Sequence, residues 1–174
     1  MAPDSKRMEI LKKAMEIEAN EKAFYEQAAA AAESPLAKQV FERLAFEEDA
    51  HARKFQEVEM QLGSSEDWPT GDAPSWEGKE LKLVFAGMKA ASPQDIKPAK
   101  SELEAMKSAM SKELEAYDMY RTRSEESTSA AEKRFYNVLA GEERLHHLAL
   151  LDAYEFLTDP AGWYSVREKW TLEG

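Results

Sequence analysis

The sequence predicts an all-α protein, a four-helix bundle made of two duplicated helical hairpins with a long crossover connection. Three observations predict it. A Glu followed thirty residues later by Glu-x-x-His occurs twice, at an offset of 95 residues. Apolar residues around both copies recur at the three- and four-residue spacing of helices. A stretch with several Gly and Pro residues separates the copies, and self-similarity at a fixed offset is typical of a duplicated unit.

The repeat extends well beyond the Glu and His residues. Residues 14–51 align with residues 109–146 without a gap, and 11 of the 38 positions are identical. The identical pairs are Ala14/Ala109, Met15/Met110, Glu18/Glu113, Tyr25/Tyr120, Ser34/Ser129, Lys38/Lys133, Leu44/Leu139, Ala45/Ala140, Glu47/Glu142, Glu48/Glu143 and His51/His146. Unrelated segments of this composition would share only a few, so we interpret the chain as a duplicated hairpin.

Length and composition favour one globular domain over residues 1–174. Hydrophobic residues make up 43% and charged residues 33%, which is typical of a folded chain. The net charge of −11 disfavours binding to nucleic acid or to anionic membranes. The sequence has no apolar run long enough to span a bilayer, and its start shows no secretory signal, so a cytoplasmic location is expected. Because the chain has no cysteine, disulfides, thiolate zinc sites and iron–sulfur clusters are excluded.

The first hairpin is expected over residues 5–62. Its first helix is predicted from Ser5 to Ala32. The inward face of that helix is expected to hold Met8, Leu11, Met15, Glu18, either Glu21 or Lys22, and Tyr25. Ser34 followed by Pro35 predicts the start of a second helix, which Gly63 ends after Leu62. Its inward face is expected to hold Val40, Phe41, Leu44, Glu48, His51 and Phe55.

The second hairpin is expected over residues 99–158 and a tail over 159–174. The Ser-Glu-Leu-Glu run from Ser101 to Glu104 predicts a capping box that opens the third helix. Ser129 repeats Ser34 and is expected to open the fourth helix, which ends near Leu157.

The link at 63–98 is predicted to be mostly loop. Within it, the spacing of Leu81, Val84, Phe85 and Met88 predicts one short amphipathic helix. The four Trp residues avoid the long helices and are expected to cover bundle ends or a subunit contact rather than bind a cofactor. They are Trp68, Trp76, Trp163 and Trp170.

Six repeated residues form a ligand set for two metal ions. They are Glu18, Glu48 and His51 in the first copy, and Glu113, Glu143 and His146 in the second. Helical residues three apart share a face, so each Glu-x-x-His pair can point at one ion. A carboxylate can bridge two cations, and an imidazole nitrogen binds one. Four carboxylates balance two divalent ions, whereas without metal their burial costs desolvation and repulsion.

Two tyrosines and a further glutamate accompany this set. Glu21 lies one turn after Glu18 and could add a carboxylate ligand, but its repeat mate is Ala116, so the repeat gives it no support. Tyr25 and Tyr120 are expected to be core residues whose hydroxyls orient ligand carboxylates, with a redox-active tyrosine as the alternative.

Three more polar residues near the motifs are given minor roles. The repeat aligns His146 with His51, so His147 is expected to support a ligand or lie at the surface. Glu47 and Glu142 are expected to be exposed neighbours of the ligands.

The ligand arrangement resembles that of ferritin-like di-iron carboxylate proteins. The segments Ala-Met-Glu-Ile-Glu at 14–18, Phe24-Tyr25, and Glu-Glu-Asp-Ala-His at 47–51 are similar to the first hairpin of the rubrerythrin branch. The resemblance covers about residues 5–158. It implies two iron ions, reduction of hydrogen peroxide or dioxygen, and a homodimer. Rubrerythrins proper also carry a cysteine-ligated rubredoxin domain, so an external electron donor, rubredoxin-like or a flavoprotein, is expected here.

Two other functions stay open on the sequence alone. The same site would serve a ferroxidase or iron-storage protein, in which oxidised iron moves on into a mineral. The bundle could also hold a metal without turnover. Manganese or zinc could replace iron, because carboxylate and imidazole ligands suit several ions.

Overall fold

The computed structural model describes residues 5–63, 67–69 and 98–165. Long helices dominate this part of the chain, and it contains no strand. The helices are α1 (Ser5–Ala31), α2 (Pro35–Leu62), α4 (Lys100–Glu126) and α5 (Ala130–Thr158), and residues 160–165 add a helical turn. The predicted all-α bundle is confirmed. None of the described helices is long and apolar enough to cross a membrane.

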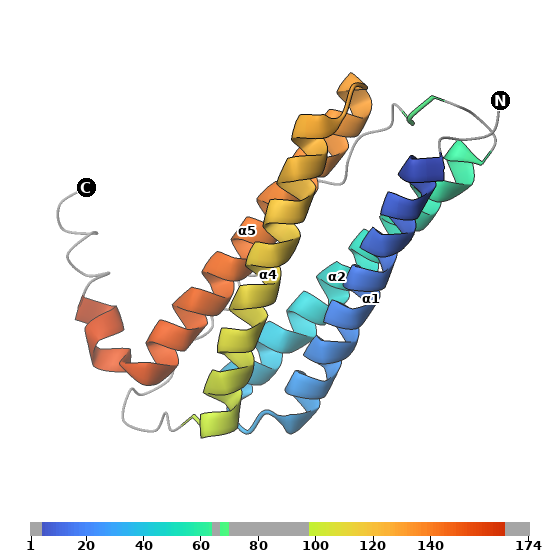
Figure 1. Ribbon diagram of the computed structural model, residues 1–174. Helices are drawn as coiled ribbons and strands as arrows, with labels where there is room; N and C mark the ends of the chain where they lie inside the picture. The colour runs from blue at the N-terminus through green and yellow to red at the C-terminus, as the bar shows by residue number, and fades with distance from the viewer. Residues whose placement is uncertain (1–4, 64–66, 70–97, 166–174) are drawn as a thin grey trace.

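The helices pair as two antiparallel hairpins, α1 with α2 and α4 with α5 (Figure 1). Helix α4 begins at the end of the bundle opposite to the end where α2 stops (Figure 1). The last residues of α2 and the first residues of α4 therefore lie at opposite ends of the bundle. The short helix predicted at 81–88, and also Trp76 and Trp170, lie outside the described residues.

Repeat-equivalent serines begin the second helix of each hairpin in the same way. Ser34 has φ −75° and ψ 126°, and its side chain accepts a hydrogen bond from the backbone N–H of Ala37. Ser129 has φ −80° and ψ 128°, and it accepts from the N–H of Glu132. Both caps satisfy an N–H that has no partner inside the helix, as the sequence predicts.

The capping box predicted at Ser101 and Glu104 is wrong. Helix α4 begins at Lys100, with Ala99 as its N-cap. The carboxylate of Glu102 takes the role expected of Glu104, because its Oε2 accepts the N–H of Ala99 at 2.7 Å.

Glu102 is displaced from the expected pattern because it also binds the other hairpin. Its Oε1 accepts the backbone N–H groups of Glu33 and Ser34, both at 2.6 Å, in the turn between α1 and α2. The repeat mate of Glu102 is Arg7, which pairs with Glu132 at the start of α5 at 3.1 Å. Each hairpin is thus tied to the turn of the other.

The apolar core is divided into two clusters, one toward each end of the bundle. Repeat-equivalent ring pairs show that the two clusters correspond. Tyr25 stacks on Phe41 with centroids 6.1 Å apart and an interplanar angle of 26°. Tyr120 stacks on Tyr136 at 6.2 Å and 22°. The duplication is therefore preserved in the packing as well as in the sequence.

The two described tryptophans pack onto these clusters, as expected. Trp163 contacts Phe156 edge-on, with centroids 5.1 Å apart, in the cluster that holds Tyr25. Trp68 contacts Phe135 at 5.4 Å in the other cluster.

The inward face of α2 is as predicted, since all six expected residues are buried. On α1 the open choice between two residues is decided for Glu21, which is buried, while Lys22 turns outward and pairs with Asp49 at 2.6 Å. Met8 and Met15 are only partly buried, because Leu11 and Ala14 occupy the centre of the face.

Replacing Glu102 by Ala should lower the free energy of unfolding by about 2–4 kcal/mol, because three backbone N–H groups lose a charged acceptor. Urea unfolding monitored by circular dichroism checks this. Glu104 pairs only at the exposed surface, with Lys100, so Glu104→Ala is the matched control and should change stability by under about 0.5 kcal/mol. Equal effects of the two substitutions would contradict the role given to Glu102.

Candidate metal centre

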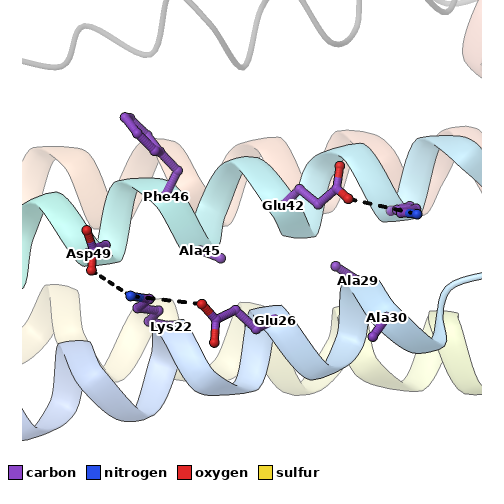
Figure 2. Close-up of a pocket in the computed structure, with 9 residues that line it drawn as sticks. Lys22, Glu26, Ala29, Ala30, Glu42, Ala45, Phe46 and Asp49 are labelled. Atoms are coloured by element: carbon purple, nitrogen blue, oxygen red, sulfur yellow. Dashed lines mark hydrogen bonds and ion pairs between the residues drawn. The ribbon is translucent and has the colours of Figure 1, made fainter.

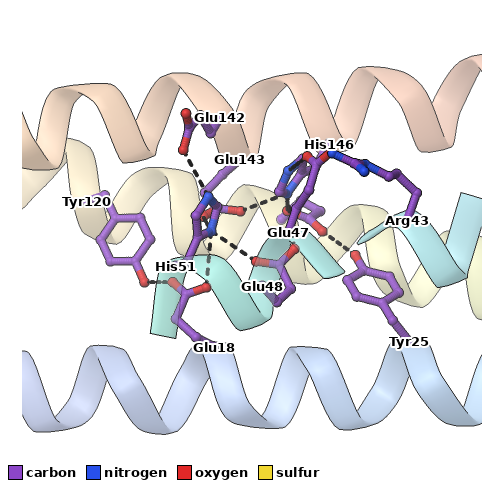
Figure 3. A network of polar contacts seen from close by, with 11 residues as sticks. Glu18, Tyr25, Arg43, Glu47, Glu48, His51, Tyr120, Glu142, Glu143 and His146 are labelled. Atoms are coloured by element: carbon purple, nitrogen blue, oxygen red, sulfur yellow. Dashed lines mark hydrogen bonds and ion pairs between the residues drawn. The ribbon is translucent and has the colours of Figure 1, made fainter. Parts of the chain in front are cut away.

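The six repeated Glu and His residues are all buried, in a layer between the two apolar clusters. Figure 3 shows Glu48, His51, Glu143 and His146 directed toward one another. Two groups of four residues each offer ligand atoms that all lie within 4.8 Å of one another. The first group is Glu18, Glu48, His51 and Glu143, and the second is Glu48, Glu113, Glu143 and His146. The structure therefore brings together every residue of the predicted ligand set.

Glu48 and Glu143 belong to both groups and lie between the histidines. Glu48 directs Oε2 toward Nδ1 of His51 and Oε1 toward Nδ1 of His146, at 3.1 Å in each case. Glu143 directs Oε1 toward His51 and Oε2 toward His146, at 3.3 Å in each case. Each of these carboxylates presents one oxygen to each half of the centre, which is the arrangement that a bridging ligand of two cations requires.

Glu18 and Glu113 each contact the histidine of only one half of the centre. Oε2 of Glu18 lies 3.2 Å from Nδ1 of His51, and Oε2 of Glu113 lies 3.4 Å from Nδ1 of His146. The second oxygen of each accepts a hydrogen bond from a tyrosine on the other hairpin: Tyr120 donates to Glu18, and Tyr25 donates to Glu113 (Figure 3). These bonds fix the orientation of both carboxylates.

The expectation that Glu47 and Glu142 are exposed is wrong. Both are buried, and each contacts the imidazole of the opposite hairpin. Nε2 of His51 lies 2.9 Å from Oε2 of Glu142, and Nε2 of His146 lies 2.8 Å from Oε2 of Glu47. A carboxylate on the far nitrogen holds an imidazole ring and directs its other nitrogen at a metal. The sequence contained one indication of this role, because Glu47 and Glu142 are an identical pair in the repeat.

The two halves of the centre differ in what supports these carboxylates. Arg43 donates from Nε to Oε1 of Glu47 at 2.7 Å, and it lies one turn earlier on α2. The repeat mate of Arg43 is Val138, so the second hairpin offers no guanidinium at the equivalent position. The centre is a pseudo-symmetric pair of sites rather than a symmetric one.

The structure places Glu21 and His147, whose roles the sequence left open, in different surroundings. Glu21 is buried beside the centre, and the charges of Glu48 and Glu113 act on its carboxylate. His147 points away, with Nδ1 3.1 Å from the carbonyl oxygen of Met110 on α4.

The donor atoms fit a pair of cations. Several donor atoms of the centre have no hydrogen bond of normal geometry to any described residue. They are both carboxylate oxygens of Glu143, Oε1 of Glu48, Oε2 of Glu113 and Nδ1 of His146. Buried polar atoms without partners are costly unless a ligand satisfies them. Oxygen and nitrogen donors without sulfur suit iron, manganese or zinc.

Burial and mutual repulsion shift the protonation of the carboxylates in the metal-free protein. Burial raises the pKa of Glu18 to about 8 and that of Glu21 to about 11, and it raises the pKa of Glu113 well above its usual value. Glu48 and Glu143 are also buried, yet their pKa values are lowered because both contact the two histidines.

The histidines and tyrosines of the centre hold their protons. Burial lowers the pKa of His51 and His146, but the surrounding carboxylates, led by Glu18 and Glu48 respectively, outweigh it and raise both pKa values well above normal. Burial, followed by the charges of Glu113 and Glu18, raises the pKa of Tyr25 and Tyr120 well above 10, so both phenols remain hydrogen-bond donors.

Comparison with known proteins identifies a family for this arrangement. A family model described as Rubrerythrin matches residues 9–154. No curated protein and no solved structure gives a significant match to the chain. The matched range contains all six residues of the candidate centre.

Divalent metal should bind more weakly as the pH falls, because metal displaces protons from Glu18 and the histidines. With the pKa of Glu18 at about 8, we expect apparent affinity to fall at least about tenfold per pH unit from pH 8 to pH 6. Isothermal titration with Co(II) in buffers of different ionisation enthalpy measures both the affinity and the protons released. A pH-independent affinity would contradict the protonation described above.

The stability of the metal-free protein should change with pH in the opposite direction to the metal affinity. The folded pKa of Glu18 lies above its unfolded value, so this group stabilises the fold at low pH and stops doing so as the pH rises through about 8. The melting temperature without metal should therefore fall from pH 6 to pH 9, while the increase caused by metal becomes larger.

Replacing Glu47 or Glu142 by Ala should weaken divalent metal binding by about 10- to 100-fold, because the imidazole loses the group that orients it. Competition titration against a chelator measures this. Glu42, an exposed residue one turn before Phe46 on α2, gives the matched control Glu42→Ala, which should bind like the unmodified protein. Unchanged affinity in both test variants would remove these carboxylates from the site.

Proposed function

Because this chain belongs to the rubrerythrin family, we propose that its centre binds two iron ions and reduces hydrogen peroxide, or dioxygen, in defence against oxidative stress. The observation that carries the proposal is the shared position of Glu48 and Glu143. Each has one oxygen toward each histidine, so the centre suits two cations held at close range rather than a single one.

Two of the six residues would contact both metal ions, and the other four would contact one ion each. Glu48 and Glu143 would bridge the two ions, while Glu18 with His51, and Glu113 with His146, would each hold one. Four carboxylates offset the charge of two divalent ions, so the loaded centre would be close to neutral. Iron bound there in the ferrous state would supply two electrons, one from each ion, and with two protons from solvent these reduce one hydrogen peroxide to two waters.

The surrounding side chains keep this centre ordered and dry. Tyr25 and Tyr120 hold Glu113 and Glu18 from the opposite hairpin, and Glu142 and Glu47 do the same for the imidazoles. The two apolar clusters on either side exclude bulk water. Fixed dipoles and charges in a dry site act more strongly than in water.

The electrons must return from a donor outside these 174 residues. The chain has no cysteine, so it cannot provide a thiolate-ligated iron as an internal relay. A rubredoxin-like protein or a flavoprotein would meet this need.

Anaerobic loading of the metal-free protein with Fe(II), followed by stopped-flow mixing with hydrogen peroxide or with dioxygen, tests the proposal. We expect two irons per chain, because the six residues resemble the ligand set of a di-iron carboxylate centre. We expect faster oxidation by peroxide than by dioxygen, because the proposed substrate is hydrogen peroxide. Preference for dioxygen, with continued oxidation of excess Fe(II), would instead support a ferroxidase that handles iron.

A double variant tests the bridging pair directly. Glu48→Ala with Glu143→Ala should abolish stoichiometric iron binding. The matched control is Glu42→Ala with Glu57→Ala, which removes two exposed carboxylates and should keep both irons. Retention of two irons by the first variant would show that the site is assigned to the wrong residues.

A further inference from the structure

A surface pocket of about 380 Å³ opens between α1 and α4. Its lining includes Ile17, Asn20 and Glu21 from α1, and Lys112, Glu115 and Ala116 from α4. The three residues of α4 are the repeat mates of the three of α1, each at the offset of 95. The pocket therefore lies over the pseudo-two-fold axis that relates the hairpins, and this axis passes between the two halves of the metal centre.

The floor of the pocket adjoins the centre. Glu21 lies one turn from Glu18, and Ala116 lies one turn from Glu113. Both floor residues are almost fully buried, at 4% and 2% exposure. Oε2 of Glu21 has no hydrogen-bond partner among the described residues, and the charge of Glu48 acts on this carboxylate. The side chain of Glu21 thus borders the pocket on one side and the centre on the other.

The repeat is broken at this floor. The carboxyl side chain of Glu21 stands on α1 where α4 has only the methyl group of Ala116, so a smaller side chain lines the pocket on the α4 side. A pocket in this position suits a small molecule that would react between the two halves of the centre.

The groove between α1 and α2 offers a comparison (Figure 2). It is larger, at about 550 Å³, and neither hollow is lined by any of the six candidate ligands. The pocket between α1 and α4 differs because its lining includes Glu21, a buried carboxyl group with one oxygen that has no hydrogen-bond partner among the described residues. Lys22 crosses it, pairing with Asp49 at 2.6 Å and with Glu26 at 3.9 Å. An ion pair between α1 and α2 therefore spans this groove.

We propose that the pocket between α1 and α4 is the route by which a small uncharged oxidant, hydrogen peroxide, reaches the metal centre. The passage runs over Ala116 and beside Glu21. Two lysines, Lys13 and Lys112, line the pocket together with the exposed carboxylate of Glu115. This mixed charge does not concentrate divalent cations, and it neither attracts nor repels a neutral molecule. The route rests on the proposed peroxide-reducing function.

Bulky substitutions at the mouth test the route. Asn20 and Glu115 are exposed residues on opposite walls, so Asn20→Trp and Glu115→Trp each cover the pocket without entering the core. The matched control is Ala30→Trp, an exposed position of α1 that lines the other groove. In the Fe(II)-loaded protein, both test variants should react with peroxide at least about tenfold more slowly, because entry becomes the slow step. Ala30→Trp should react at the unmodified rate, and all variants should bind the same amount of iron.

A second readout needs no metal. Met119 also lines the pocket, and peroxide converts a methionine thioether to its sulfoxide, releasing water. In the metal-free protein, mass spectrometry should show slower oxidation of Met119 in both test variants. Met60, which is 69% exposed, is the internal reference and should be oxidised at one rate in every variant.

The outcomes separate the two proposals. Slower oxidation of both Met119 and iron, in the two test variants alone, supports the route. Protection of Met119 with unchanged iron oxidation overturns it, and so does failure of both variants to protect Met119, since the pocket would then be no confined passage. If the unmodified Fe(II)-loaded protein does not react with peroxide, the proposed function itself fails, and the route fails with it.

Discussion

The compensation of charge in one buried layer is the constraint on which the rest of the structure depends. Four carboxylates and two imidazoles lie between two apolar clusters, where an isolated charge would be very unfavourable. Raised pKa values on Glu18 and Glu113 show how the metal-free protein reduces this charge by holding protons. Two divalent cations would replace those protons, so metal binding would stabilise the fold.

The same layer makes each hairpin depend on the other. Tyr25 and Glu47 of the first hairpin hold Glu113 and His146 of the second. Tyr120 and Glu142 of the second hairpin likewise hold Glu18 and His51 of the first. Neither half of the centre is complete within one hairpin, which is a physical reason for the two copies to pack as a single bundle.

The departures from symmetry are as informative as the repeat. Arg43 supports the carboxylate behind His146, whereas its repeat mate is Val138. Glu21 lies beside the centre, whereas its repeat mate is Ala116. Both departures are on the first hairpin, so the two halves of the candidate centre have different surroundings although their six repeated Glu and His residues match. Two ions bound in such a centre would therefore have unequal surroundings.

By itself, the sequence determined the all-α class and the N-caps at Ser34 and Ser129, because these follow from periodicity and local hydrogen bonding within single helices. It also predicted that six Glu and His residues converge, because their spacing is repeated without a gap in the two hairpins. Only the tertiary structure decided which partners meet across helices. Glu47 and Glu142 look solvent-facing on their own helices, and Glu102 replaces the expected Glu104 because a turn of the other hairpin lies against it. Such contacts depend on how the helices are rotated and aligned against one another, and one-dimensional spacing does not contain that information.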